Sequence, residues 1–396
     1  MRQIPWRLVA LVGAGGLLAA CGAGANASPT WVPQPSISLE AGPRGTQPSQ
    51  PGGPPGAPGG TPTTVPSSPG SSNPSSTAGS GILATNLDAP TGVTLLPDGT
   101  ALVGERTTGR ILRVQPKPAP VSVVRTLTGL SRSGDGGLLD LALSPTYAQD
   151  GLIYAYITTP TDNRVIDFTL TGPTAPVLER IPRGTTGNTG RLLFDSRGRL
   201  FVGTGDAGSP QLAASATSLA GKVLRVDGIG KAAAGNPTPG SPVYTRGHHT
   251  VNGLCTSAAL GSVIETEAPS EINLLKSGGN YGWPTAATGT QRPARTLPST
   301  RSGVAGCAVI GSELFVVTTD GQALLSATVT TPGRIGALTV VKLDQNYGRL
   351  RTVVAAPDGA LWLTTTNKDG HGHPAPTDER VIRLVPPSPT GGTSPV

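Results

Sequence analysis

The chain has 396 residues, with 56 glycines, 40 prolines, 13% charged residues and a formal net charge of +7. This composition argues against a helical protein. The basic residues are scattered and do not alternate with aromatic residues, so we predict no nucleic-acid partner.

Residues 1–21 are typical of a bacterial lipoprotein signal peptide. Two arginines precede an apolar run from Leu8 to Leu18, which is too short to span a bilayer comfortably. The following "LAAC" resembles a lipobox, and this resemblance implies cleavage before Cys21 and acylation of its thiol. We therefore expect a lipid-anchored protein on the extracytoplasmic face of the cell membrane, in the cell envelope, where the environment is oxidising.

Residues 22–80 are rich in proline, glycine and serine and nearly free of charged and large apolar side chains. Such a segment cannot bury enough apolar surface to offset the entropy lost on ordering. We predict a disordered tether here and a disordered tail over residues 387–396.

The body between residues 81 and 386 repeats one pattern six times: an apolar strand, a turn, an alternating strand and usually a further strand bearing Arg or Lys. The repeats begin "TGVTLLPDGTALVGE", "GLLDLALSPTYAQDGLIYAY", "GRLLFDSRGRLFVGTGD", "NGLCTSAALGSVIETEAP", "GVAGCAVIGSELFVVTT" and "RTVVAAPDGALWLTTTN". Pro-Asp-Gly in the first and last repeats predicts tight reversals, because glycine accepts a positive φ. Repeats of roughly 50 residues that lack a helical period predict an all-β fold, a six-bladed β-propeller.

A propeller gathers two sets of loops around one end of its channel: those that lead into the innermost strands and those that join the middle strands. The polar residues expected there are Asp135, Thr186–Thr189, His248, His249, Arg349 and Arg351 in the first set and Glu105, Asp206, Glu267 and Thr319 in the second. Such convergence predicts a concave ligand site. We place His371 and His373 in an outer connection on the opposite face, as part of a solvated loop.

Cys255 and Cys307 each lie in a short apolar run, and neither belongs to a CxxC motif. In an oxidising compartment we expect them to form a buried disulfide, with two packed free thiols as the alternative.

Several motifs resemble the soluble glucose/sorbosone dehydrogenase family. They are "GDGGLL", "GRLLF" with "GTGD", "SLAGKVLRVDG", "YTRGHHTVNGL" and "EINLLKSGGNYGWP". The stretches "GDGGLLDLALSPTYAQD", "TPTDNRV" and "GNTGRLLF" further resemble the actinobacterial lipoprotein Z branch. The resemblance implies a six-bladed propeller that binds pyrroloquinoline quinone (PQQ) in its mouth and oxidises an aldose.

The resemblance also implies roles for the loop residues. The family base is a His in a His-Asn-Gly-Gly-Arg-like motif, and the matching residue here is Gly187, followed by Asn188. A second family motif carries an Arg that supports the base and an assisting Asn. Those positions are His249 and Thr250 here, after His248.

Two arginines match the pair that clamps the quinone carboxylates in the family, Arg349 and Arg351, a task that suits guanidinium. Asp135 matches a Gln or Glu near the reacting carbon, and Thr319 matches a cofactor-binding Lys. We therefore predict Arg349, Arg351, Asp135, Asn188 and His248 as cofactor-binding residues. The calcium segment shrinks to residues 267–271 and offers few oxygens, so we predict no metal site.

Three functions stay open on the sequence. The first is a propeller that binds a small anion, sugar or quinone and has altered or lost oxidoreductase activity. The second is an active quinoprotein sugar dehydrogenase in which His249 is the base, since imidazole titrates near neutral pH. The third is a cell-envelope scaffold that binds another protein through the propeller rim. We expect a monomer.

Overall fold

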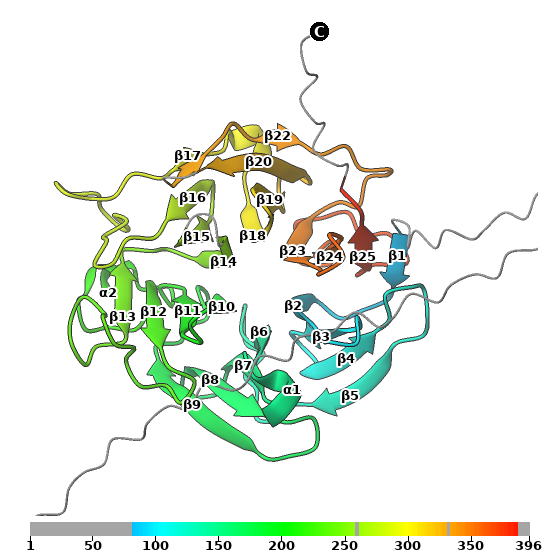
Figure 1. Ribbon diagram of the computed structural model, residues 1–396, viewed down its shortest axis with the longest axis horizontal. Coiled ribbons are helices and arrows are strands. Elements are labelled where there is room, and N and C mark those ends of the chain that lie inside the picture. The colour runs from blue at the N-terminus through cyan, green and yellow to red at the C-terminus, as the bar shows by residue number, and fades with distance from the viewer. Residues whose placement is uncertain (1–80, 258–260, 331–332, 387–396) are drawn as a thin grey trace, which may run out of the picture. The chain divides into compact units, whose positions relative to one another are not determined.

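The computed structural model describes residues 81–257, 261–330 and 333–386. The predicted signal peptide, tether and C-terminal tail lie outside these residues. The described chain forms six antiparallel sheets around a central axis, which Figure 1 shows end-on. This arrangement confirms the predicted all-β, six-bladed propeller.

Each blade runs outward from an innermost strand that lies at the axis (Figure 1). The strands of blade 1 are β2 (Pro90–Leu95), β3 (Ala101–Glu105), β4 (Arg110–Val114) and β5 (Ser122–Thr126). Those of blade 2 are β6 (Leu138–Leu143), β7 (Ile153–Thr158), β8 (Asn163–Phe168) and β9 (Thr174–Ile181). Those of blade 3 are β10 (Gly190–Phe194), β11 (Leu200–Thr204), β12 (Lys222–Val226) and β13 (Val243–Arg246).

The remaining blades follow the same order. Blade 4 contains β14 (Val251–Ser257), β15 (Ser262–Glu267), β16 (Glu271–Leu274) and β17 (Arg295–Thr296). Blade 5 contains β18 (Val304–Ile310), β19 (Glu313–Thr318), β20 (Leu324–Thr330), β21 (Arg334–Ile335) and β22 (Thr339–Val340). The described helices are short and lie in connections: α1 (Tyr147–Asp150), α2 (Pro210–Ala214) and the 3-10 turn η1 (Ser299–Arg301). None of the helices in the described ranges is long and apolar enough to cross a membrane.

Blade 6 joins the two ends of the propeller. Its inner strands are β23 (Leu350–Ala355), β24 (Leu361–Thr365) and β25 (Val381–Leu384), and β1 (Gly81–Ala84) pairs with β25 as the outermost strand. Backbone pairing between the start and the end of the body therefore closes the ring. The repeats did not predict β1, because it is a lone strand outside the repeated pattern.

The blades pack through apolar residues that alternate along their strands, and the innermost strands approach one another closely. At Gly92 in β2, a Cβ atom would lie only 2.7 Å from the backbone nitrogen of Leu141 in β6. Glycine there permits the backbones of two adjacent blades to come together. The close ring of innermost strands leaves a cavity of about 370 Å³ in the central channel, lined by all six blades.

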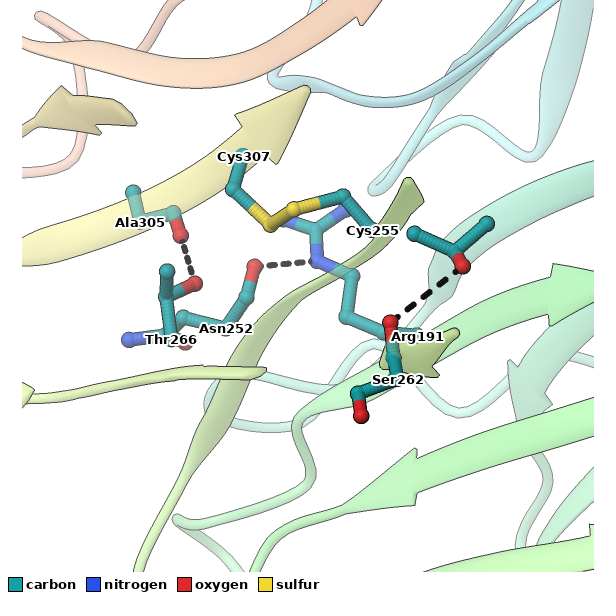
Figure 2. Close-up of a disulfide and its surroundings, with 8 residues drawn as sticks. Arg191, Asn252, Cys255, Ser262, Thr266, Ala305 and Cys307 are labelled. Carbon is teal, nitrogen blue, oxygen red and sulfur yellow. Dashed lines mark hydrogen bonds between the residues drawn. A yellow bond between two sulfur atoms is a disulfide. The ribbon is translucent and has the colours of Figure 1, made fainter. Parts of the chain in front are cut away.

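A disulfide between Cys255 and Cys307 links β14 to β18, the innermost strands of blades 4 and 5 (Figure 2). The two Cα atoms are 5.8 Å apart, and both residues are buried along the channel cavity. The predicted disulfide is confirmed, and the free-thiol alternative is excluded. Figure 2 also shows Arg191 of β10, whose Nε donates a 2.6 Å hydrogen bond to the carbonyl oxygen of Asn252.

Candidate functional site: the propeller mouth

A second cavity, of about 880 Å³, lies where the loops that lead into the innermost strands converge. All six blades line it, through these loops and through the loops that join their middle strands. Its titratable lining residues are Asp88, Arg106, Asp135, Arg349, Arg351, Lys368, Asp369, His371 and Glu379. A polar, concave site of this size fits a small molecule.

Arg349 lines this cavity but is held by carboxylates. Its Nε donates to Asp369 at 2.9 Å and its Nη1 donates to Asp320 at 2.6 Å. The backbone N–H of Arg349 also donates to Asn367 Oδ1 at 2.7 Å, which fixes the start of the last repeat. The predicted pair of arginines therefore reaches the mouth, but the charge of Arg349 is largely neutralised.

Arg351 differs from Arg349 because it has no carboxylate within ion-pair distance among the described residues. The one hydrogen bond that its side chain makes within the described chain runs from Nη1 to Asn252 Oδ1, at 3.4 Å. Burial, followed by the charge of Arg191, lowers the pKa of Arg351 to about 9, so the side chain stays cationic at neutral pH. An unneutralised guanidinium in the mouth is suited to a carboxylate or phosphate.

Asp135 also lines the cavity, but its carboxylate serves the loop at the predicted base position. Asp135 Oδ2 accepts a 2.7 Å hydrogen bond from the N–H of Gly187, and Oδ1 accepts a 2.5 Å bond from Asn188 Nδ2. Asn188 is fully buried and also bonds to Gly184 and Asn163, so its amide supports the loop from behind.

Gly187 has φ of +70°, in the left-handed region. A Cβ atom there would lie 2.6 Å from Asp206 Oδ1 and 2.8 Å from the nitrogen of Gly208. Position 187 is therefore closed to a side chain in this loop conformation. The position that the resemblance matches to the family His therefore has no space for an imidazole in this loop conformation.

His248 and His249 follow one another but lie in different environments. His248 is fully buried, stacks on Tyr281 and is absent from the cavity lining. His249 stacks on Trp283 with ring centroids 4.2 Å apart, and 39% of its side chain is exposed. Its Nε2 lies 3.9 Å from Asp206 Oδ2.

The expectation that His371 lies on the opposite face is wrong, because His371 lines the same cavity as Arg349. The repeat pattern alone makes the loop between β24 and β25 look like an outer connection. Because β1 supplies the outermost strand of blade 6, this loop joins middle strands and opens at the mouth.

Thr319 lines the cavity as expected, whereas Glu105, Asp206 and Glu267 are buried and do not. Sequence reasoning missed Arg106 and Lys368. Each lies one to three residues beyond the second strand of its blade. Its place in the loop that joins the two middle strands was therefore the only signal in the sequence that it reaches the mouth.

Comparisons with known proteins agree with this architecture. The family model "Glucose / Sorbosone dehydrogenase" matches residues 87–310. The PQQ-bound aldose sugar dehydrogenase from Streptomyces coelicolor is 34% identical, with a TM-score of 0.72 over 76% of this chain and 95% of that chain. A putative oxidoreductase (glucose dehydrogenase) from Thermus thermophilus is 32% identical, with a TM-score of 0.70 over 77% of this chain and 98% of that one.

Among curated proteins, quinoprotein glucose dehydrogenase B of Acinetobacter calcoaceticus is 29% identical over 252 residues, which is 52% of this chain. The match spans about half of that relative, 52% of its length. The chain belongs to the glucose/sorbosone dehydrogenase family.

Proposed function

We propose that this propeller binds a small anionic ligand in its mouth, with PQQ as the first candidate, and that its oxidoreductase chemistry is altered or lost. The observation that carries the proposal is Arg351, a cation that lines the cavity with one long hydrogen bond and no ion pair in the described chain. The PQQ-bound form of the Streptomyces relative supports the choice of ligand.

The described residues fit the binding of PQQ better than they fit its use. A quinone carboxylate would lie against Arg351. Arg106 also lines the mouth, where its Nη1 donates to the carbonyl oxygens of Gly134 and Gly136, and its charge would add to that of Arg351. Bound PQQ would supply the hydride acceptor for sugar oxidation. The residue at the family base position is Gly187, which accepts no proton, and its surroundings exclude a side chain.

One observation favours the second candidate, an active dehydrogenase with a relocated base. Asp206 Oδ1 would lie 2.6 Å from a Cβ atom at Gly187. Asp206 Oδ2, which accepts a 2.9 Å hydrogen bond from Trp283 Nε1, lies 3.9 Å from His249 Nε2. The imidazole of His249 therefore lies close to the space that the family base would use. An imidazole beside a carboxylate is a recurrent arrangement for a general base.

The decisive experiment is titration calorimetry of PQQ into the purified full-length chain, with and without calcium, followed by dye reduction with a panel of aldoses. The Arg351→Ala variant should bind PQQ more weakly, and Arg113→Ala, on β4 outside the cavity, is the matched control. Binding without turnover supports the proposal. Turnover that His249→Gln abolishes supports the second candidate, and absence of binding contradicts both and points to the scaffold function.

We also propose that acylated Cys21 anchors the chain to the extracytoplasmic face of the cell membrane. The support is the apolar run followed by "LAAC". In cell fractionation, the native chain should stay with membranes and Cys21→Ser should move to the soluble or secreted fraction. Retention of Cys21→Ser in the membrane fraction would contradict the anchor.

A further inference from the structure

Beneath the mouth, blade 4 holds a buried group of one imidazole and two carboxylates that the proposed function does not use. His248 and Glu265 are fully buried and Glu267 is 4% exposed. One ligand atom from each of the three lies within 4.8 Å of the others. His248 lies three residues before the start of β14. The two glutamates lie two residues apart on β15, so they share one face of the strand.

Each of the three side chains is also hydrogen-bonded to a different group outside the cluster. His248 Nε2 lies 2.8 Å from Thr245 Oγ1, which leaves Nδ1 facing the carboxylates. Glu267 Oε1 accepts a hydrogen bond from the N–H of His249. Glu265 Oε2 accepts a 2.8 Å bond from Asn273 Nδ2, its neighbour on β16. Such outer partners orient the ligands of metal sites.

Two of the polar atoms in and beside this group have no partner in the described protein. Glu265 Oε1 is buried without a hydrogen-bond partner, and so is Asn273 Oδ1. His248 Nδ1 forms a 3.1 Å hydrogen bond with Glu267 Oε2 and lies 3.9 Å from Glu265 Oε1. The described chain places no Lys or Arg in an ion pair with either glutamate. Two buried carboxylates with one imidazole lack the positive charge that buried anions require.

We propose that His248, Glu265 and Glu267 bind a Zn²⁺ ion, which supplies this missing charge. With zinc–ligand distances near 2.1 Å, tetrahedral ligands lie about 3.4 Å apart. The two distances from His248 Nδ1 bracket this value. Calcium takes six or more oxygen ligands, which this closed space does not provide. One nitrogen and two carboxylates suit zinc instead.

The zinc would have a structural role. The N–H of His249 bonds to Glu267, so a metal that fixes Glu267 and His248 also fixes the backbone that presents His249. A closed site of this kind is filled as the chain folds, because binding energy for the metal contributes to folding. This inference does not depend on PQQ binding.

The test measures zinc in the full-length chain expressed in zinc-supplemented medium and desalted before elemental analysis. We expect one zinc per chain in the native protein and roughly a tenfold or larger loss in Glu265→Gln. Gln fits the site, because its oxygen can accept from Asn273 and its amide can donate toward His248. In Co²⁺-grown protein, the visible spectrum should show tetrahedral coordination that Glu265→Gln lacks.

The matched control is His371→Ala/His373→Ala, which removes the exposed imidazoles and should keep the full zinc content. Thermal unfolding separates folding from binding. Glu265→Gln should match the metal-stripped native chain or exceed it in Tm, and added Zn²⁺ before refolding should raise the Tm of the native chain only. Equal zinc content in the native chain and Glu265→Gln overturns the proposal. A native chain without zinc also overturns it.

Discussion

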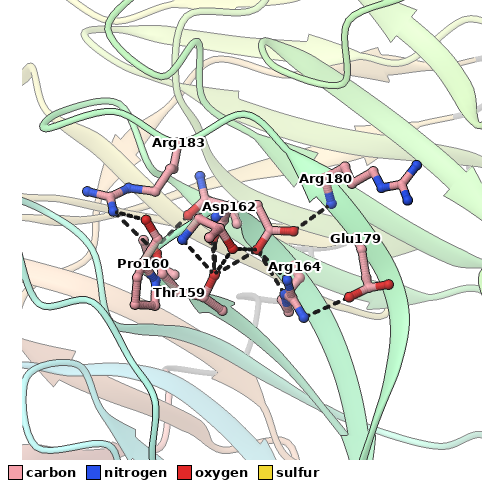
Figure 3. A network of polar contacts seen from close by, with 10 residues as sticks. Thr159, Pro160, Asp162, Arg164, Glu179, Arg180 and Arg183 are labelled. Carbon is pink, nitrogen blue, oxygen red and sulfur yellow. Dashed lines mark hydrogen bonds and ion pairs between the residues drawn. The ribbon is translucent and has the colours of Figure 1, made fainter.

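Two buried acidic centres, one in blade 2 and one in blade 4, are built in opposite ways. In blade 2, Asp162 receives donors on both oxygens: Oδ1 accepts from Thr159 Oγ1 at 2.7 Å and Arg164 Nε at 2.9 Å, and Oδ2 accepts from the N–H of Arg180 at 2.7 Å (Figure 3). In blade 4, Glu265 has one donor and one unpartnered oxygen.

The difference appears in the pKa directions. Burial alone would raise the pKa of Asp162, but the bonds from Thr159, Arg180 and Arg164 hold it below the ordinary value. Burial raises the pKa of Glu265 well above its ordinary value, and the charge of Glu267 adds to this effect. A saturated carboxylate stabilises the fold, whereas a buried carboxylate oxygen without a partner requires a further group, which we propose to be zinc at Glu265.

The largest effect should come from the saturated centre. Asp162→Ala would leave Thr159, Arg164 and the N–H of Arg180 without their shared acceptor, and we expect a loss of about 3 kcal/mol in the free energy of unfolding. Urea denaturation measures it. In the same assay without metal, Glu265→Gln should leave the free energy of unfolding unchanged. Similar losses for both variants would show that the comparison is wrong.

Gly187 tests whether one substitution can place an imidazole at the position that the resemblance matches to the family base. Gly187→His should destabilise by about 2 kcal/mol, because φ is positive and the Cβ atom would overlap Asp206. Gly359→His is the control, since Gly359 has φ of +82° with nothing within 4 Å of its Cβ position. We expect a smaller loss there and no dye reduction in either variant. Sugar oxidation by Gly187→His would show that the loop readily makes space for a base.

The two mouth arginines extend the comparison to cations. Arg351→Ala should weaken PQQ binding by roughly tenfold or more, because it removes the unneutralised guanidinium. Arg349→Ala should weaken binding less and cost about 1 kcal/mol of stability, since one of its partners, Asp320, is largely exposed. Calorimetry measures the PQQ affinity of both variants, and urea denaturation measures their free energy of unfolding. A larger affinity loss for Arg349→Ala would reverse the assignment.

The sequence predicted the fold better than the site for a physical reason. Each repeat begins with the two inner strands of a blade, whose alternation and turn residues are local signals. The strand β1 pairs with residues some 300 positions away, and no local pattern marks such pairing. Because β1 was not predicted, the loop between β24 and β25 looked like an outer connection, and His371 was therefore placed on the wrong face.

Within the site, loop position predicted which residues approach the mouth, and Arg351, Asp135 and Thr319 do so. Loop position could not predict the direction in which each side chain points. His248 and His249 are adjacent, yet one imidazole turns into blade 4 and the other stacks on Trp283. The spacing of Glu265 and Glu267 along one strand was a visible signal for a buried pair. The partners that orient them come from other strands and appear only in three dimensions.

The smallest expected effect concerns Asp140, whose carboxylate is intermediate between the saturated one of Asp162 and the partly unpartnered one of Glu265. Its Oδ2 accepts a 2.9 Å bond from the N–H of Leu192, while Oδ1 lies 3.5 Å from Arg191 Nη1. Burial raises the pKa of Asp140 above 3.8, and the charge of Arg191 only partly opposes this. A raised pKa means that the folded state holds the proton more tightly than the unfolded state does.

Asp140 therefore contributes most to stability below pH 3.8, and this contribution is lost as the pH rises through the folded-state pKa. Asp140→Asn cannot titrate, so the stability of the native chain relative to this variant should fall between acidic and neutral pH. Urea denaturation at a series of pH values measures the slope. A relative stability that increases with pH would mean that the ion pair with Arg191 outweighs burial, and Asp140 would then belong with the saturated centres such as Asp162.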